Sequence, residues 1–97
     1  MPLVSIIIPC YNVAPFMKKC LDTVCSQTLR DIQIICINDG SGDGTLDILR
    51  EYEAADERFV VIDQPNAGVA AARNAGLDAA SGEYIGFVDP DLSLIHI

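Results

Sequence analysis

Two aspartates one residue apart, Asp89 and Asp91, follow an apolar run at residues 84–88. Hard cations such as Mg²⁺ and Mn²⁺ take oxygen ligands, and Mg²⁺ is usually held by one or two carboxylates together with substrate phosphates. The pair therefore predicts a divalent-metal site that presents a diphosphate. These residues alone leave open a second interpretation, in which they only build a turn at the exit of a strand.

The charge of the whole chain favours a cation at such a site. The 97 residues include 14 Asp and Glu against 6 Lys and Arg, a formal net charge of -8. An anionic phosphate would be repelled on balance unless a bound cation reversed the local sign. The same charge argues against a nucleic-acid partner, because proteins that bind a phosphate backbone carry basic surfaces.

Length and composition predict one folded domain. A hydrophobic fraction of 51% excludes a disordered chain. The cysteines lack a C-x-x-C spacing and the single histidine is His96, so we expect reduced cysteines in the core and no zinc site. We recognise no signal peptide or membrane-spanning run and expect a cytoplasmic protein. The four cysteines are Cys10, Cys20, Cys25 and Cys36.

Apolar, β-branched runs alternate with amphipathic stretches along the chain. The runs predict four strands, and the stretches between them predict three helices. Because parallel neighbours need a long return connection, this βαβαβαβ order predicts an α/β fold, doubly wound, with a mainly parallel sheet. The strands are expected at 3–9, 32–37, 59–62 and 83–88, and the helices after residue 12, around 46–52 and at 69–80.

Polar and glycine-rich clusters follow every predicted strand. The carboxyl ends of parallel strands lie along one edge of the sheet, and ligands of doubly wound folds bind in the crevice there. We therefore expect the functional site at that edge. The clusters are Tyr11 and Asn12 after the first strand, 39–41 after the second, 64–68 after the third, and Asp89 and Asp91 after the fourth.

Asp39 begins a polar loop that runs to Gly44. The loop is not a dinucleotide fingerprint, because Thr45 stands where the third glycine would be. Nor is it an EF-hand, because Arg50 stands where that motif needs a glutamate. What remains is an acid able to accept a hydrogen bond from the edge of a base, with a simple Asx turn as the alternative.

Three further residues have both a functional and a structural interpretation. Arg73 could meet a phosphate through charge-assisted bonds, or could be a solvated surface arginine. Tyr11 could stack on a ring or belong to the core. Gly68 most simply supplies a backbone angle that other residues resist.

In combination, these motifs closely resemble family 2 glycosyltransferases. The resemblance spans residues 3–91, and the order and spacing of the motifs make it specific although each motif alone is weak. The matching segments are 5–12, 37–41 with Asp43 and Thr45, 66–68, 72–74 and 89–91.

The resemblance implies the nucleotide-binding half of a GT-A fold, in an inverting enzyme that transfers a sugar from a nucleotide-diphosphate donor to an acceptor hydroxyl. It also implies a divalent cation, Mn²⁺ or Mg²⁺, and a donor that is most commonly a uridine diphosphate sugar. By this resemblance the donor is bound by Pro9, Tyr11, Asn12, Asp39, Gly68, Arg73 and Asp89, and the metal by Asp91 and Asp89.

The chain also departs from the family pattern. Leu92 stands where members usually have another acid, and the resemblance places the catalytic base in a downstream acceptor region that is missing here. We expect residues 1–91 to be the nucleotide-sugar-binding part, 92–97 to be a non-native tail, and the chain to be inactive in transfer. The full-length protein would use a saccharide or lipid-linked acceptor, and would meet the inner face of a membrane only through the missing segments.

Two other classes of function remain as alternatives. A non-catalytic nucleotide-binding module would show the same motifs. A phosphoacceptor signalling domain, with Asp63 as the acceptor, would also be doubly wound. The phosphoacceptor alternative is disfavoured. Domains of that class have paired acids at the end of the first strand, where this chain has Pro9 and Cys10.

Overall fold

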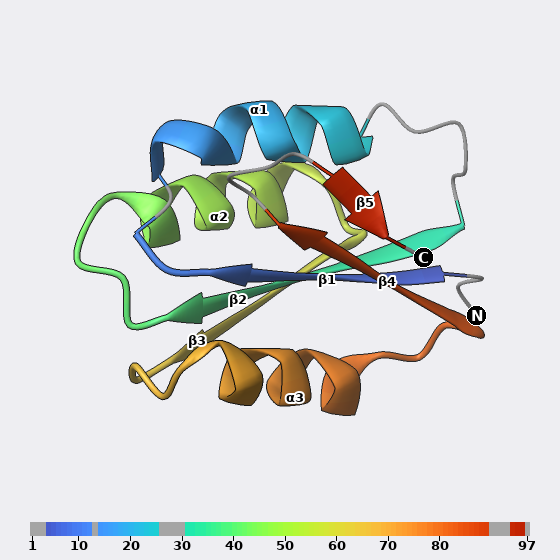
Figure 1. Ribbon diagram of the computed structural model, residues 1–97. Helices are drawn as coiled ribbons and strands as arrows, with labels where there is room; N and C mark the ends of the chain where they lie inside the picture. Colours follow the sequence, from blue (N-terminus) through green and yellow to red (C-terminus); the bar gives the residue numbers. More distant parts are fainter. Residues whose placement is uncertain (1–3, 13, 26–30, 90–93, 97) are drawn as a thin grey trace.

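A computed structural model describes residues 4–12, 14–25, 31–89 and 94–96, with the backbone alone at 16, 25, 89 and 94–96 (Figure 1). Strands and helices alternate up to the fourth strand, as the sequence predicts. The strands are β1 (Val4–Cys10), β2 (Ile32–Asp39), β3 (Phe59–Gln64), β4 (Tyr84–Asp89) and β5 (Leu94–His96), and the helices are α1 (Ala14–Cys25), α2 (Thr45–Ala55) and α3 (Val69–Ala79).

The five strands form one sheet in the order β3-β2-β1-β4-β5. The first four are parallel, which confirms the predicted doubly wound α/β fold. After β3 the chain returns past β2 and β1 to place β4 on the far side of β1. The winding direction therefore reverses between β1 and β4, and folds of this kind bind ligands at the carboxyl ends of the strands beside that point.

The short strand β5 was not anticipated from the sequence. It pairs antiparallel with the end of β4, with Phe87 opposite His96 and Asp89 opposite Leu94. It falls within residues 92–97, for which the sequence analysis expects a non-native tail. That expectation stays a prediction.

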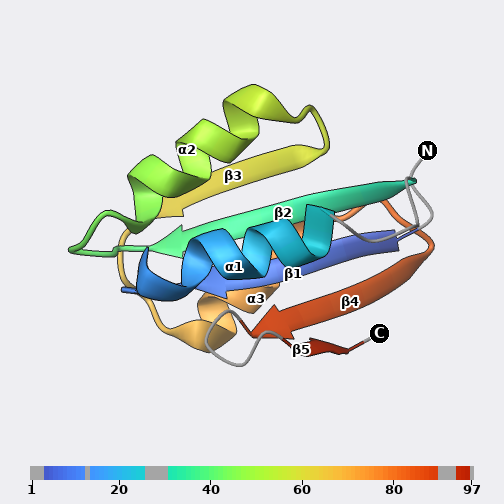
Figure 2. The same cartoon turned by 90° about the horizontal axis from the view of Figure 1, so that it is seen from above.

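The helices cover both faces of the sheet. Figure 1 shows α1 and α2 on one face and α3 on the other. Figure 2, seen from the α1 side, shows α1 over the middle of the sheet and α2 displaced toward β3. Alternate residues of β1 pack into the two layers: Ile6 and Ile8 on the α1 and α2 side, Ile7 on the α3 side. Burial on both faces explains the unbroken apolar run of this strand.

Small residues bring α3 close to the sheet. Ala72 and Gly76 are its buried positions. A methyl group added at Gly76 would lie 2.5 Å from Cγ2 of Ile7 and 3.0 Å from Cδ1 of Ile37. This close packing fixes the first turn of α3, and with it Gly68, at the carboxyl edge of the sheet.

Hydrogen bonds among neutral groups hold the opposite, amino edge. Oε1 of Gln33 accepts from the Ser5 hydroxyl at 2.8 Å and from the Ser81 backbone N–H at 3.0 Å. The Gly82 N–H donates to Oγ of Ser5 at 2.8 Å. The turn between α3 and β4 is thereby tied to β1 and β2.

The cysteines whose side chains are described lie in the core. Cys10, Cys20 and Cys36 are all buried on the α1 and α2 side of the sheet. Burial raises the pKa of the Cys10 thiol well above its usual value, and the neighbouring Cys20 adds to the shift. Cys10 is therefore an apolar core residue at neutral pH. Among the described residues, no helix has the length and hydropathy needed to cross a bilayer.

Candidate functional site

A pocket of about 300 Å³ opens at the carboxyl ends of β1 and β2, beside the start of α3. It lies at the edge where the sequence predicts the site. Four of the predicted site residues line it, namely Pro9, Tyr11, Asp39 and Gly68. The complete lining is Pro9, Cys10, Tyr11, Asp39, Asn66, Gly68, Val69 and Ala72.

Asp39 provides a buried carboxylate in this pocket, with only 3% of the residue exposed. Its Oδ1 accepts from Nε2 of Gln64 at 3.0 Å and from the Ala67 N–H at 2.9 Å. Its Oδ2 accepts from the Gly68 N–H at 3.0 Å. The bond from Gln64, helped by the two backbone bonds and opposed by burial, holds the pKa of this carboxyl below its usual 3.8.

Asp39 is therefore ionised at neutral pH and can only accept hydrogen bonds. A carboxylate has about four acceptor positions, and the three bonds within the chain leave capacity at Oδ2. A ligand that reaches this carboxylate would have to offer it an N–H or O–H group.

Two glycines with positive φ allow the loop at 64–68 to lie against the end of β2. Gly68 has φ +96°, in agreement with the backbone role expected for it. Gly40 has φ +70°, and a methyl group there would lie 2.6 Å from the backbone nitrogen of Asn66. Nδ2 of Asn66 also donates to the Asp39 carbonyl at 3.2 Å. The loop is thus fixed by both the backbone and the side chain of Asp39.

Two large apolar side chains at the pocket are exposed. Tyr11 is 51% exposed and Val69 is 57% exposed. Both are in the lining, Tyr11 after β1 and Val69 at the start of α3. Exposed aromatic and aliphatic groups around an acceptor provide apolar surface for a flat ring. Tyr11 is therefore not a core residue, which was the structural alternative for it.

Asn12, another predicted donor-binding residue, is not part of the lining. Its Oδ1 accepts from the Gly42 N–H at 2.7 Å, and its own N–H donates to Oγ of Ser41 at 3.0 Å. Asn12 has φ +50°, the only positive value for a non-glycine residue in the described segments. Its side chain serves the neighbouring loop.

Arg73 also lies outside the pocket lining. It is exposed on α3, and its Cζ lies 5.8 Å from the centre of the Phe87 ring on β4. Arginine over an aromatic face is a favourable cation–π arrangement. The guanidinium therefore lies over β4, one strand away from the pocket.

The predicted metal site falls mostly outside the described residues. Asp91 is not among them, and for Asp89 the backbone alone is described. That backbone ends β4, two residues beyond the last β1–β4 pair, Ile7 with Phe87. Asp89 therefore stands at the carboxyl end of β4, the strand beside β1. Within the described part of the chain, no three acidic, histidine or cysteine side chains gather as metal ligands.

Asp63, the acceptor in the phosphoacceptor alternative, is not in the pocket lining either. It is exposed near the end of β3, where Oδ1 accepts from Nδ2 of Asn38 at 2.9 Å. No cluster of acids accompanies it in the described segments. The geometry gives no support to that alternative.

Sequence reasoning did not assign a role to several residues around the pocket. Val69 and Asn66 line it, and Ser41 and Gly42 bind the segment after β1. An apolar residue directly after Gly68, at the start of a helix, was the available signal for Val69. The bond that Asp43 accepts from Ala14 joins residues 29 positions apart and leaves no local signal, whereas its bonds from Thr45 are local.

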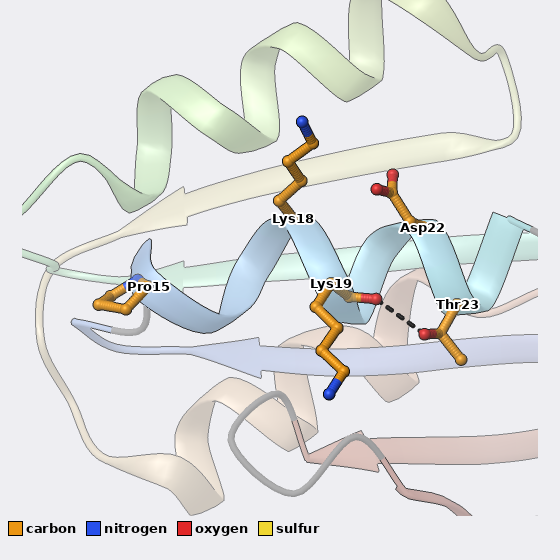
Figure 3. Close-up of a pocket in the computed structure, with 5 residues that line it drawn as sticks. All are labelled: Pro15, Lys18, Lys19, Asp22 and Thr23. Carbon is orange, nitrogen blue, oxygen red and sulfur yellow. Dashed lines mark hydrogen bonds between the residues drawn. The ribbon is translucent and has the colours of Figure 1, made fainter.

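A second hollow of about 590 Å³ lies on the outer side of α1. Figure 3 shows Lys18 and Lys19 extending to opposite sides of the helix, so their charges do not converge on one point. Asp22 accepts from the Tyr52 hydroxyl at 2.6 Å, which joins α1 to α2. None of the predicted site residues is present. The hollow is lined by Pro15, Lys18, Lys19, Asp22 and Thr23.

Comparison with known proteins gives close relatives among bacterial glycosyltransferases. The glycosyltransferase EpsJ of Bacillus subtilis is 53% identical over 90 residues, which cover 93% of this chain and 26% of that protein. The chondroitin synthase of Pasteurella multocida is 41% identical over 90 residues, covering 93% of this chain and 9% of the synthase. The chain therefore spans about a quarter of the length of EpsJ, and less of the synthase.

Solved structures agree with the sequence relatives. The mannosyltransferase PcManGT from Pyrobaculum calidifontis, in complex with GDP-Man and Mn²⁺, matches with a TM-score of 0.86 and 27% identity, over 93% of this chain and 28% of the other. TarS 1-349 of S. aureus, in complex with UDP-GlcNAc, matches with a TM-score of 0.85 and 29% identity, over 92% and 26%.

These matches confirm that the chain has the Rossmann-like half of a GT-A fold. The family model for glycosyl transferase family 2 aligns with residues 5–95, nearly the whole chain. The resemblance found from the motifs is thereby confirmed, and this chain belongs to glycosyl transferase family 2.

Proposed function

We propose that this chain binds the nucleotide-sugar donor in a glycosyltransferase that moves a sugar from a nucleoside diphosphate to an acceptor hydroxyl. The observation that carries the proposal is the ionised Asp39 carboxylate in a pocket beside the exposed ring of Tyr11. Family membership and the nucleotide-sugar complexes of TarS and PcManGT support it.

The pocket residues divide the recognition of the nucleotide base between stacking and hydrogen bonding. Tyr11 and Pro9 offer apolar surface to the face of the base. Oδ2 of Asp39 accepts from an N–H group on its edge. A base that presents a ring N–H fits an acceptor-only partner, and both uracil and guanine carry one. The uridine donor implied by the resemblance agrees with this chemistry, and UDP is the first probe to use.

The charged end of the donor would lie toward β4. Asp89 ends that strand, and Arg73 lies over Phe87 of the same strand. We propose that Asp91 and Asp89 hold a divalent cation there, Mn²⁺ or Mg²⁺, and that Arg73 lies near the ribose or diphosphate. Carboxylates suit such cations, and PcManGT was solved with Mn²⁺. When bound, the cation would supply Lewis-acid assistance to the departing diphosphate.

The remaining parts of the reaction are assigned outside this chain. Inversion requires a carboxylate base that takes the proton of the acceptor hydroxyl. We propose that this base, and the site for a saccharide or lipid-linked acceptor, belong to the segments that the longer relatives have and this chain does not. The 97 residues would then bind the donor without transferring the sugar. We also propose that the protein works in the cytoplasm, with any membrane contact made by those other segments.

Calorimetry of UDP binding, with and without Mn²⁺, tests this function. The wild-type chain should bind UDP more tightly with Mn²⁺, and Asp91→Asn should abolish the gain. Asp39→Asn should weaken binding whether or not Mn²⁺ is present, because it changes the contact to the base. Asp47→Asn is the matched control, since Asp47 is exposed on α2 away from the pocket and its substitution removes the same charge.

The two parts of the proposal fail separately. A folded wild-type chain that binds no UDP under any condition contradicts donor binding. Binding that Mn²⁺ does not strengthen, or that strengthens equally in Asp91→Asn, contradicts the metal site and leaves the base pocket intact. Release of labelled sugar to an acceptor by the 97-residue chain would contradict the assignment of the base to other segments.

A further inference from the structure

Three hydrogen bonds join the segment after β1 to the loop after β2. The Asn12 N–H donates to Oγ of Ser41 at 3.0 Å, and the Gly42 N–H donates to Oδ1 of Asn12 at 2.7 Å. The Ala14 N–H donates to Oδ2 of Asp43 at 3.2 Å. We call these five residues, Asn12, Ala14, Ser41, Gly42 and Asp43, the clasp.

Asp43 serves the starts of two helices with one carboxylate. Oδ2 accepts from the first residue of α1, Ala14, and Oδ1 accepts from the Thr45 N–H at 3.0 Å and from the Thr45 hydroxyl. An anionic group is favourable at a helix N-terminus, because the unpaired N–H groups there carry partial positive charge. The first turns of α1 and α2 are thus held to the same side chain.

Asn12 has a backbone conformation that few residues accept. A φ of +50° is unfavourable for most side chains, and asparagine is one of the few that tolerate it. The two reciprocal bonds to Ser41 and Gly42 hold this conformation in place. Asn12 directly follows Tyr11, and the chain bends at these two residues, so the backbone at Asn12 constrains the backbone that carries Tyr11.

Burial does not fix the Tyr11 ring, which is half exposed, so its position depends on the backbone on either side. Before it, Cys10 is buried at the end of β1. After it, the clasp holds Asn12. The opposite wall of the pocket, at residues 64–68, is held by Asp39. One loop, 39–43, therefore ties both walls of the pocket to the end of β2.

We infer that the clasp positions Tyr11 for stacking on the nucleotide base, with Asn12 and Asp43 as positioning residues that do not themselves touch the nucleotide. This inference rests on the proposed function and deepens it. It assigns to Asn12 a role different from the donor contact that the sequence resemblance implied.

Calorimetry of UDP binding at a fixed, saturating Mn²⁺ concentration tests the inference. Asn12→Gly keeps the positive φ accessible and removes the acceptor for Gly42, so UDP should bind about threefold to tenfold more weakly, the usual effect of one lost hydrogen bond. Asn12→Asp retains an acceptor and should bind nearly as well as wild type. Asp43→Asn should weaken binding like Asn12→Gly, whereas the matched control Asp47→Asn should not.

A double-mutant cycle with Tyr11→Ala separates positioning from a general structural role. If the clasp acts through the Tyr11 ring, Asn12→Gly should cause no further loss of UDP affinity once that ring is absent. An equal loss on the Tyr11→Ala background contradicts the inference, as does unchanged affinity in Asn12→Gly itself. Should Asn12→Gly fail to fold, Ser41→Ala, which removes only the acceptor for the Asn12 N–H, is measured in the same cycle.

The outcome for the wild-type chain distinguishes the two proposals. A folded wild-type chain that does not bind UDP contradicts the proposed function, and the role of the clasp in that function with it. UDP binding that is insensitive to Asn12→Gly and Ser41→Ala contradicts the clasp alone.

Discussion

The amino and carboxyl edges of the sheet hold their turns and loops in place with different chemical groups. At the amino edge, neutral Gln33 accepts hydrogen bonds from Ser5 and Ser81 and so ties a turn to the sheet. At the carboxyl edge, ionised Asp39 and Asp43 tie the loops. The amide and hydroxyl groups at the amino edge bond to one another, whereas the carboxylates have acceptor capacity beyond the bonds they make within the chain.

This difference separates stability from binding. The amino edge is closed by its own hydrogen bonds, and none of its residues lines the pocket. The carboxyl edge keeps an open pocket with a charged acceptor and exposed apolar groups, which are the features of a ligand site. Changes at the amino edge should therefore affect folding alone, and changes at the carboxyl edge should affect binding as well.

Gly40→Ala should have the largest effect, because it strains the backbone and forces two segments apart. At φ +70°, the added methyl group would lie 2.6 Å from the Asn66 nitrogen. We expect a loss of about 3 kcal/mol in the free energy of unfolding, from strain and overpacking together. UDP affinity should fall with it, because residues 64–68 form one wall of the pocket.

Urea unfolding followed by circular dichroism measures the free energy of unfolding. Calorimetry without urea, at a temperature where both variants are fully folded, measures the UDP affinity. Gly44→Ala is the matched control, because a methyl group at Gly44 has no atom within 4 Å and Gly44 has φ -80°. Equal losses in the two variants would show that neither the close approach nor the positive φ at Gly40 matters.

Gln33→Leu should have the next largest effect and should leave binding unchanged. The substitution removes the acceptor for the buried Ser5 hydroxyl and for the Ser81 N–H. We expect about 2 kcal/mol less stability, since a buried polar group that loses its partner keeps its desolvation penalty. UDP affinity, measured on the folded fraction, should equal that of wild type. A selective loss of affinity without a loss of stability would remove the distinction between the edges.

The fold was predictable because its signals are local. Burial on both faces gives β1 an unbroken apolar run, and helices between such runs leave few topologies open. The position of Pro9, Tyr11, Asp39 and Gly68 at one pocket follows from the same rule, because parallel strands end at one edge.

The parts of the site that the sequence could not supply depend on contacts between distant residues. The bonds of Asn12 join it to a loop about thirty positions away, so its type and position did not indicate a clasp. Arg73 lies over Phe87 through a tertiary contact between α3 and β4, which no periodicity encodes. The metal-binding role of Asp89 and Asp91 stays a prediction from the motif and the family.

The smallest expected effect is a pH dependence that belongs to the carboxyl edge. The hydrogen bonds from Gln64, Ala67 and Gly68 lower the pKa of folded Asp39 below the 3.8 of an exposed aspartate. A group with a lowered folded-state pKa contributes its stability above the unfolded pKa, and loses that contribution as the pH falls through the folded value. The midpoint temperature of thermal unfolding should therefore be constant near neutral pH and should fall as the pH drops below about 4.

Two variants show which edge is responsible for this pH dependence. Asp39→Asn should unfold at a lower temperature near neutral pH and lose less on acidification, because its side chain no longer takes up a proton. It should not lose the dependence completely, since hydrogen bonds also lower the pKa of Asp43, Glu53 and Asp56. Gln33→Leu should lower the unfolding temperature by the same amount at every pH, because Gln33 does not titrate. An acid transition in Asp39→Asn as large as that of wild type would mean that other carboxylates, and not Asp39, carry the pH dependence.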